Sequence, residues 1–176
     1  VGLTVAAGVT GAGGGGCCGG ANPRVGVANN NPAQGNSVGL NAAGTAALTL
    51  GPPPSSGINL SAAAHDNLIG GTVPGAGNVV YGNAALLLAT GAHHNTVQGN
   101  FIGTNATGTA GVGSVVGIDT NNSPHDNLIG GSAAGAGNVI SGNVNGIQLS
   151  DGAATNTTMG NFIGTDPTGL LPVPNT

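Results

Sequence analysis

The sequence predicts an all-β fold in which one structural unit repeats along the chain, a β-solenoid. Residues 65–83, HDNLIGGTVPGAGNVVYGN, return at 125–143 as HDNLIGGSAAGAGNVISGN, with 14 of 19 positions identical. Short aliphatic segments of about 4 to 8 residues alternate with Gly, Asn and Pro, which is typical of short strands. Charged residues make up only 3% of the 176 residues, so the surface must consist largely of neutral polar groups.

The low charge limits the partners that the chain can bind. The only base is Arg24, Lys and Glu are absent, and all five acids are Asp. One Arg cannot form the basic patch that neutralises phosphates, so nucleic acid is excluded as an expected partner. A nearly neutral surface of Asn, Thr, Ser and Gly has little self-repulsion and favours association between copies.

The sequence contains no run that approaches the ~18 apolar residues of a membrane span, and no signal-peptide pattern. We therefore expect no membrane span, and a chain that is mature, internal or truncated.

The repeat extends beyond its first block. NTVQGNFIGTNATG at 95–108 matches NTTMGNFIGTDPTG at 156–169 at 10 of 14 positions, and the offset grows from 60 to 61, which indicates one extra loop residue. A weaker copy precedes both, because QGNSVGLNAAGTA at 34–46 aligns with 98–110. We predict one solenoid domain over 1–176, with a degenerate unit at 1–64, a unit at 65–124 and an incomplete unit at 125–176. A unit of this length suits either two or three coils.

The expected strands carry the aliphatic residues of each unit. NLIGG (67–71), NVVYGN (78–83), ALLLAT (85–90), NTVQGNFIG (95–103) and VVGID (115–119) are rich in Val, Ile and Leu and are bounded by Gly or Asn. A helix is excluded, because the apolar residues lack helical spacing and each internal Gly would cost about 1 kcal/mol.

Stacking of equivalent strands predicts columns of like residues. Strands of successive coils lie about 4.8 Å apart, so inward aliphatic side chains stack and Asn side chains at equivalent corners form hydrogen-bonded ladders. The candidate ladder pairs are Asn67/Asn127, Asn78/Asn138, Asn83/Asn143, Asn95/Asn156 and Asn100/Asn161. Glycines at the same corners are expected to adopt positive φ: Gly82, Gly142, Gly99 and Gly160.

These motifs carry a resemblance to a known superfamily. GAGNVISGN (135–143), GIQL (146–149) and NTVQGNFIGT (95–104) resemble the repeats of bacterial right-handed parallel β-helix proteins of the pectate-lyase-like superfamily. The resemblance covers about residues 25–170 and implies a right-handed parallel β-helix. It implies no activity, because the superfamily includes lyases, hydrolases, adhesins and structural shafts.

The catalytic patterns of that superfamily are not matched here. Its lyases use Arg or Lys as base with Asp-bound calcium, and its hydrolases use an Asp cluster with His and a basic residue. This chain offers only Arg24, in the degenerate unit. We therefore expect no enzyme activity and no cofactor.

Histidines and cysteines provide the remaining candidate sites. His65–Asp66 and His125–Asp126 recur before the same NLIGG, so a repeated corner explains them better than two active sites. His93–His94 could bind a metal, but an exposed loop is the simpler interpretation. Scattered aspartates lack a calcium-binding spacing, and the adjacent Cys17 and Cys18 fit no zinc or redox motif. We expect no metal site.

Four Asn-x-Ser/Thr sequons occur, at Asn59, Asn105, Asn121 and Asn156. Asn105 lies in the loop best suited to glycosylation if the protein is secreted by a glycosylating cell.

The expected function is structural, outside the cell or at its surface. Solenoids have open strand edges, and neither terminus shows a capping helix or charged residues that would block pairing. Head-to-tail contact between copies would propagate into a filament. One alternative is a β-helical shaft within a larger secreted adhesin or glycan-binding protein. Weaker alternatives are a polysaccharide lyase or hydrolase and an ice-binding solenoid.

Overall fold

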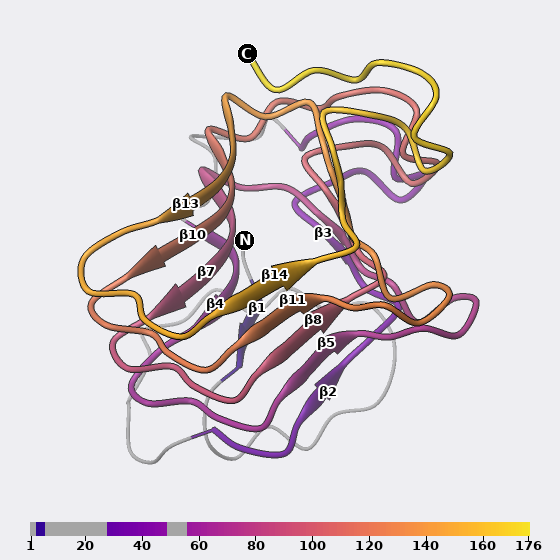
Figure 1. Ribbon diagram of the computed structural model, residues 1–176. Coiled ribbons are helices and arrows are strands. Elements are labelled where there is room, and N and C mark those ends of the chain that lie inside the picture. The colour runs from indigo at the N-terminus through magenta and orange to yellow at the C-terminus, as the bar shows by residue number, and fades with distance from the viewer. Residues whose placement is uncertain (1–2, 6–27, 49–55) are drawn as a thin grey trace.

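The fold is built from three parallel β-sheets. The computed structural model describes residues 3–5, 28–48 and 56–176, and these residues contain strands and turns but no helix (Figure 1). Each sheet has five strands, and every neighbouring pair is parallel. The predicted all-β parallel solenoid is confirmed.

Sheet I contains β1 (Leu3–Val5), β4 (Ser56–Leu60), β7 (Ala84–Ala89), β10 (Val116–Asn121) and β13 (Asn145–Leu149). Sheet II contains β2 (Pro32–Ala33), β5 (Leu68–Gly70), β8 (Thr96–Gln98), β11 (Leu128–Gly130) and β14 (Thr157–Met159). Sheet III contains β3 (Ser37–Val38), β6 (Val79–Val80), β9 (Phe101–Ile102), β12 (Val139–Ile140) and β15 (Phe162–Ile163).

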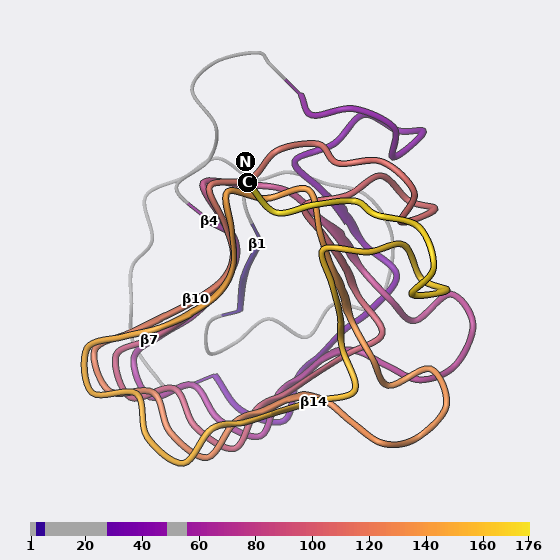
Figure 2. The same cartoon turned by 45° about the horizontal axis from the view of Figure 1, so that its top comes forward.

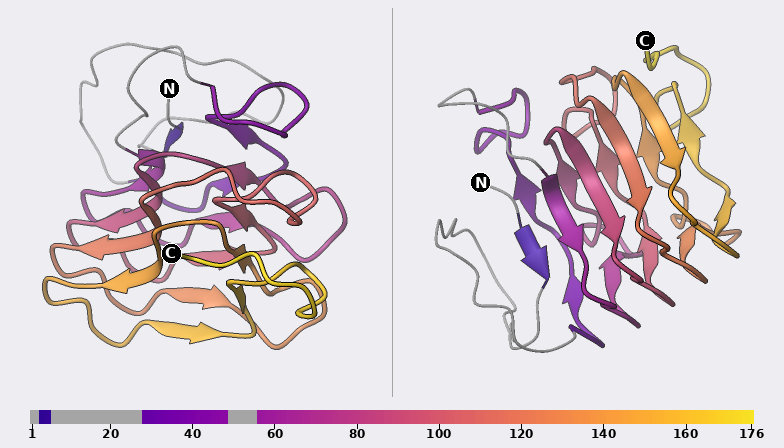
Figure 3. Two further views of the ribbon diagram at one scale, coloured as in Figure 1. Left: turned by 90° about the horizontal axis from the view of Figure 1, so that it is seen from above. Right: turned by 90° about the vertical axis from the view of Figure 1, so that its left-hand side faces the viewer.

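The chain visits the three sheets in the same order on every turn. We number the turns as coils 1 to 5: β1–β3, β4–β6, β7–β9, β10–β12 and β13–β15. Strands of each coil pair with the equivalent strands of the next coil, so the coils superpose when seen along the stack and follow one another when seen from the side (Figures 2 and 3).

One sequence repeat spans two coils. Successive rungs of the same corner lie 28, 32 and 29 residues apart, so two coils account for the repeat of about 60 residues. Coils 1, 3 and 5 carry a hairpin after sheet III, at 40–47, 104–111 and 165–172, each closed by an antiparallel bridge. Coils 2 and 4 instead carry a side loop between sheets II and III, at 71–77 and 131–137. Two loop types therefore alternate along the stack.

Aliphatic columns fill the interior. Ile58, Leu86 and Ile118 lie in register in sheet I and are fully buried. Sheets II and III contribute further columns from buried residues in register: Ile69, Val97 and Ile129, and Val80, Ile102 and Ile140. Alternate side chains of a strand face opposite sides, so each short strand contributes one or two residues to this core. Burial of each such side chain stabilises the fold by about 1.5–3 kcal/mol.

The corner between sheets I and II is a tight turn with two successive left-handed residues. Ala62 and Ala63 have φ of 55° and 57°, and the N–H of Ala64 donates to the carbonyl of Ser61 at 3.2 Å. Positive φ at both central positions is the mark of a type I′ turn. The equivalent pairs in coils 3 to 5 also have positive φ: Thr90/Gly91, Asn122/Ser123 and Asp151/Gly152.

Three of the four predicted corner glycines adopt positive φ. Gly99, Gly142 and Gly160 have φ of 65°, 70° and 66°. The prediction is wrong for Gly82, whose φ lies outside the left-handed region. A Cβ at Gly82 would lie 2.6 Å from the backbone nitrogen of Gly57, so a glycine is required here because two segments of the backbone lie very close together.

Candidate functional site

The first ladder runs beside sheet II. The backbone N–H and the side-chain Nδ2 of Asn67 both donate to Oδ1 of Asn95, at 3.1 and 2.9 Å. Asn95 makes the same pair of bonds to Asn127, at 3.0 and 2.9 Å. From coil 2 onward each side chain also donates to a carbonyl of the preceding coil, as Asn95 does to Ala64. The rungs of this first ladder are Asn31, Asn67, Asn95, Asn127 and Asn156.

The second ladder runs beside sheet III with the same geometry. Asn78 donates to Oδ1 of Asn100 through its backbone N–H at 3.0 Å and its Nδ2 at 2.8 Å. Asn100 donates likewise to Asn138, and all three are buried. The rungs of this second ladder are Asn36, Asn78, Asn100, Asn138 and Asn161.

Four of the five predicted pairs therefore lie in ladders, but the Asn83/Asn143 pair is wrong. Asn83 is exposed, whereas Asn143 is buried and donates to Oδ1 of Asn175. The cause is the extra loop residue: residues 81–83 join β6 to β7, but residues 141–144 join β12 to β13. Asn143 consequently lies one position further back from its strand than Asn83 does.

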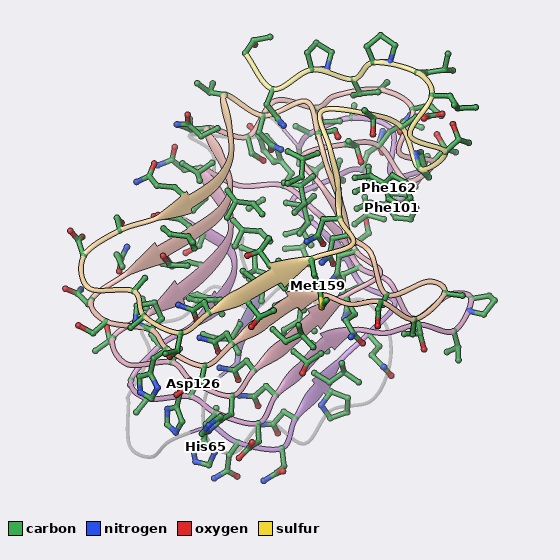
Figure 4. The ribbon with its side chains drawn as sticks, in the orientation of Figure 1. His65, Phe101, Asp126, Met159 and Phe162 are labelled. Atoms are coloured by element: carbon green, nitrogen blue, oxygen red, sulfur yellow. The ribbon has the colours of Figure 1, made fainter. Side chains whose placement is uncertain are left out.

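A column of histidine rings lies at the corner between sheets I and II. His93 stacks between His65 and His125, with ring centroids 5.0 and 4.9 Å apart. His94 meets His93 edge-on at 5.1 Å. The three stacked rings come from coils 2, 3 and 4, where each histidine forms a single parallel bridge to the next. Figure 4 shows His65 and Asp126 at this same corner.

Each stacked ring is held through its Nδ1 atom. Nδ1 of His65 lies 2.7 Å from Oδ2 of Asp66, and Nδ1 of His125 lies 2.9 Å from Oδ2 of Asp126. Nδ1 of His93 lies 2.9 Å from the carbonyl oxygen of Gly91. A carbonyl can only accept, so this contact places a proton on Nδ1 of His93.

The His–Asp contacts depend on local backbone conformation. Adjacent residues on an extended strand would face opposite sides, but Asp66 and Asp126 both have φ of 55°, which turns each carboxylate back toward the preceding ring. The hydrogen bond from His65 lowers the pKa of Asp66. Hydrogen bonds from Thr155 and then His125 lower the pKa of Asp126.

The exposed-loop interpretation of His93–His94 is wrong for His93. His93 is half-buried within the column, and only His94 is exposed, with φ of 53°. In the described ranges, no group of three or more His, Cys, Asp or Glu side chains is arranged to hold a metal ion. Cys17, Cys18 and Arg24 lie outside the described residues.

Coil 5 leaves the aliphatic columns open. Leu149 is 53% exposed and Ile163 is 48% exposed, whereas their column neighbours one or two coils back, Leu88 and Ile140, are fully buried. Met159 on β14 is also exposed at this end (Figure 4). The burial of these columns ends at coil 5.

The ladders end at coil 5 with two backbone N–H groups that have no partner among the described residues. Asn156 and Asn161 accept hydrogen bonds from the rungs below them, at 2.8 and 2.9 Å. In every earlier rung the backbone N–H donates to the Oδ1 of the following rung, as Asn127 does to Asn156 at 3.0 Å. The N–H groups of Asn156 and Asn161 therefore point to the place of a further coil.

Asn105 lies at the base of the hairpin 104–111. It is half-buried, and its Oδ1 accepts from the N–H of Thr109 at 3.0 Å and from Oγ1 of Thr107 at 3.1 Å. Asp166 holds the same place in coil 5, where its carboxylate accepts from Thr168 and Leu170. Glycosylation of Asn105 stays a prediction from its sequon.

The fold and its corners define a parallel β-solenoid with two internal asparagine ladders. No family model, curated protein or solved structure matches the chain. The resemblance to the pectate-lyase-like superfamily thus stays a prediction from the sequence. No helix with the length and apolar character needed to traverse a bilayer occurs in the described residues.

Proposed function

We propose that this chain is a structural β-solenoid of an extracellular or cell-surface rod, in which coil 5 receives a further parallel coil. The observation that carries the proposal is the exposure of Leu149 and Ile163 at positions that are buried in the coils before them. A further coil would bury these side chains, each with a stabilisation of about 1.5–3 kcal/mol.

The ladders support a rod that grows in one direction. The N–H groups of Asn156 and Asn161 face the C-terminal side, and by the same geometry Oδ1 of Asn31 and Asn36 faces the N-terminal side. Donors at one end and acceptors at the other match a head-to-tail arrangement. The low charge supports close stacking, because 3% charged residues give little repulsion between coils.

Lengthening the chain tests the rod. Residues 116–176, which form coils 4 and 5, are appended once, twice or three times after Thr176. Each added unit contributes two coils, so small-angle scattering should show a length increase of about 9.6 Å per unit at constant cross-section. Added units that leave the length unchanged, or that scatter as an unfolded chain, would overturn the proposal.

End-to-end stacking of separate copies is a second candidate: the complementary ladder ends favour it, but it would place the hairpins of coils 1 and 5 at neighbouring levels. Negative-stain electron microscopy at moderate concentration tests it directly. Long uniform fibres would support stacking of copies. Isolated short rods at every concentration would overturn this candidate.

The proposal assigns no catalysis to the His–Asp pairs. His65 and His125 occupy equivalent positions two coils apart, and both belong to one stacked column. Both pairs are explained by a structural role, because the same corner recurs in the repeat and holds the stacked histidine rings in place. Binding of glycans stays a prediction from the resemblance.

A further inference from the structure

We infer that the coil which fits on coil 5 is a side-loop coil of this same repeat, like coil 4, and not a hairpin coil such as coil 1 of a second copy. The inference rests on the proposed function, because it specifies the partner of the open coil 5 surface. Three contacts within the stack carry it.

The first contact is a hydrogen bond that only a side loop supplies. Gly35 in coil 1 donates its N–H to the carbonyl of Ala76 at 3.0 Å, and Gly99 in coil 3 donates to Ala136 at 3.2 Å. Both acceptors lie in the side loop of the following coil. Gly160 is the equivalent corner of coil 5, with φ of 66° against 65° in Gly99. A hairpin coil has a tight corner in place of the side loop and therefore no such carbonyl.

The second contact is between hairpins two coils apart. The N–H of Ala106 in coil 3 donates to the carbonyl of Gly44 in coil 1 at 2.9 Å. A Cβ built on Gly108 would lie 2.8 Å from Cγ of Pro167 in coil 5. Hairpins that skip one coil therefore touch each other directly, and no space remains for a hairpin at the level between them.

Hairpin 165–172 is fixed against the outer face of sheet III. A Cβ on Gly169 would be 3.4 Å from the ring of Phe162, and a Cβ on Gly108 would be 2.8 Å from the ring of Phe101. Figure 4 shows both rings together beside the hairpins. Coil 1 of a second copy, placed on coil 5, would bring its hairpin 40–47 into the level next to 165–172, where the packed hairpin blocks it.

The third contact is the short corner between sheets III and I in a side-loop coil. Gly142 of coil 4 donates its N–H to the carbonyl of Val173 at 3.2 Å. A Cβ on Gly142 would overlap the Cα of Gly111 in the hairpin of coil 3. Because a Cβ would not fit beside the hairpin of coil 3, this corner must be a glycine. The partner coil therefore needs Asn at both ladder positions, a side loop and a glycine at this corner.

Two extended full-length chains test the inference. One carries residues 116–144, which form the side-loop coil 4, after Thr176. The matched chain carries residues 84–115, which form the hairpin coil 3, at the same place. Amide hydrogen exchange is followed at Gly160, Asn156 and Asn161, together with the thermal midpoint.

The side-loop extension should slow exchange at all three amides by about 10-fold or more and raise the thermal midpoint. The hairpin extension should leave Gly160 exchanging as in the unextended chain. Equal protection of Gly160 by both extensions would overturn the inference and leave the proposed function standing. Protection by neither extension would overturn the proposed function itself.

A control variant tests whether the side loop itself protects Gly160. In the side-loop extension, the appended copy of residues 131–137 is replaced by a single Gly, as at the corner of coil 3. Protection should then persist at Asn156 and Asn161 but be lost at Gly160. Concentration-dependent protection of Gly160 in the unextended chain would show that coil 1 of a second copy docks, and would overturn the inference.

Discussion

His93 and His125 lie face to face, with ring centroids 4.9 Å apart and ring planes 11° from parallel. They belong to neighbouring coils of the stack and are 32 residues apart in the chain. The column also contains His65 and His94, with Asp66 and Asp126 beside it.

The stack predicts a loss of stability in His93→Ala. Removing the central ring deletes two stacked contacts, to His65 and His125, and should lower the free energy of unfolding by about 1–3 kcal/mol. His94→Ala, which removes only edge contacts, is the control and should cost less. Urea unfolding measures both variants; equal losses would contradict the prediction.

Asp166 predicts a loss of stability in acid. The hydroxyl of Thr168, followed by the N–H groups of Leu171 and Leu170, lowers the pKa of Asp166. Its contribution to stability is therefore complete above its unfolded pKa of about 3.9 and is lost as the pH falls through the lower folded value. Asp166→Asn keeps the acceptor oxygen, as in Asn105 of coil 3, and removes this dependence. Thermal midpoints from pH 7 to pH 2 should show the wild-type chain losing stability relative to the variant; parallel curves would count against the prediction.

The buried ladders predict that substitution by alanine destabilises the fold much more at Asn100 than at Asn83. Asn100→Ala removes the Oδ1 that accepts from both nitrogens of Asn78 at 3.0 and 2.8 Å, in a side chain that is 1% exposed. With two buried donors unsatisfied, the free energy of unfolding should fall by about 3 kcal/mol or more. Asn83→Ala, at the exposed position, should change it by no more than about 0.5 kcal/mol. Denaturant unfolding compares them, and similar losses for both variants would refute the ladder's contribution.

Alanine substitutions at Gly142 and Gly113 distinguish the destabilisation caused by steric crowding from that caused by backbone strain. Both have positive φ, of 70° and 89°, but a Cβ on Gly113 meets nothing within 4 Å whereas a Cβ on Gly142 overlaps Gly111. Gly113→Ala should therefore destabilise the fold by about 1–2 kcal/mol through strain alone. Gly142→Ala should destabilise it by more, because the backbone between two hairpins must shift. Equal unfolding free energies for the two variants would exclude the crowding.

Much of the fold could be predicted from the sequence because the stacking of coils copies residues from one turn to the next. Most Asn and aliphatic positions of residues 65–83 and 125–143 are equivalent in the structure, and eight of the ten predicted ladder residues are rungs of the two ladders. A ninth, Asn143, makes the same pair of bonds to Asn175, and only Asn83 makes none. Comparison at an offset of 60 residues could not show the nearest neighbours, because those lie about half as far away.

The histidine column was missed for this reason. At the longer offset, His93 aligns with Ala154, but its stacking partners are His65 and His125. The signal was a shorter spacing, His-x-Asn, which occurs at 65–67, 93–95 and 125–127. Asn31, the first rung of one ladder, lies in the degenerate unit where the surrounding letters no longer match. Asn36, the first rung of the other ladder, lies in QGN at 34–36, which is identical to QGN at 98–100, so its signal was present in the sequence. Gly82 was misjudged because a glycine required by crowding looks the same in sequence as one required by positive φ.

The alternation of hairpins and side loops gives a lengthened rod two different periods. Its hydrogen-bonded backbone repeats at every coil, about 4.8 Å, but its outer surface repeats only at every second coil, about 9.6 Å. Fibre diffraction from such a rod should therefore contain a meridional reflection at twice the strand spacing. A ligand or neighbouring fibre that recognises the loops would therefore find equivalent binding positions only at every second coil.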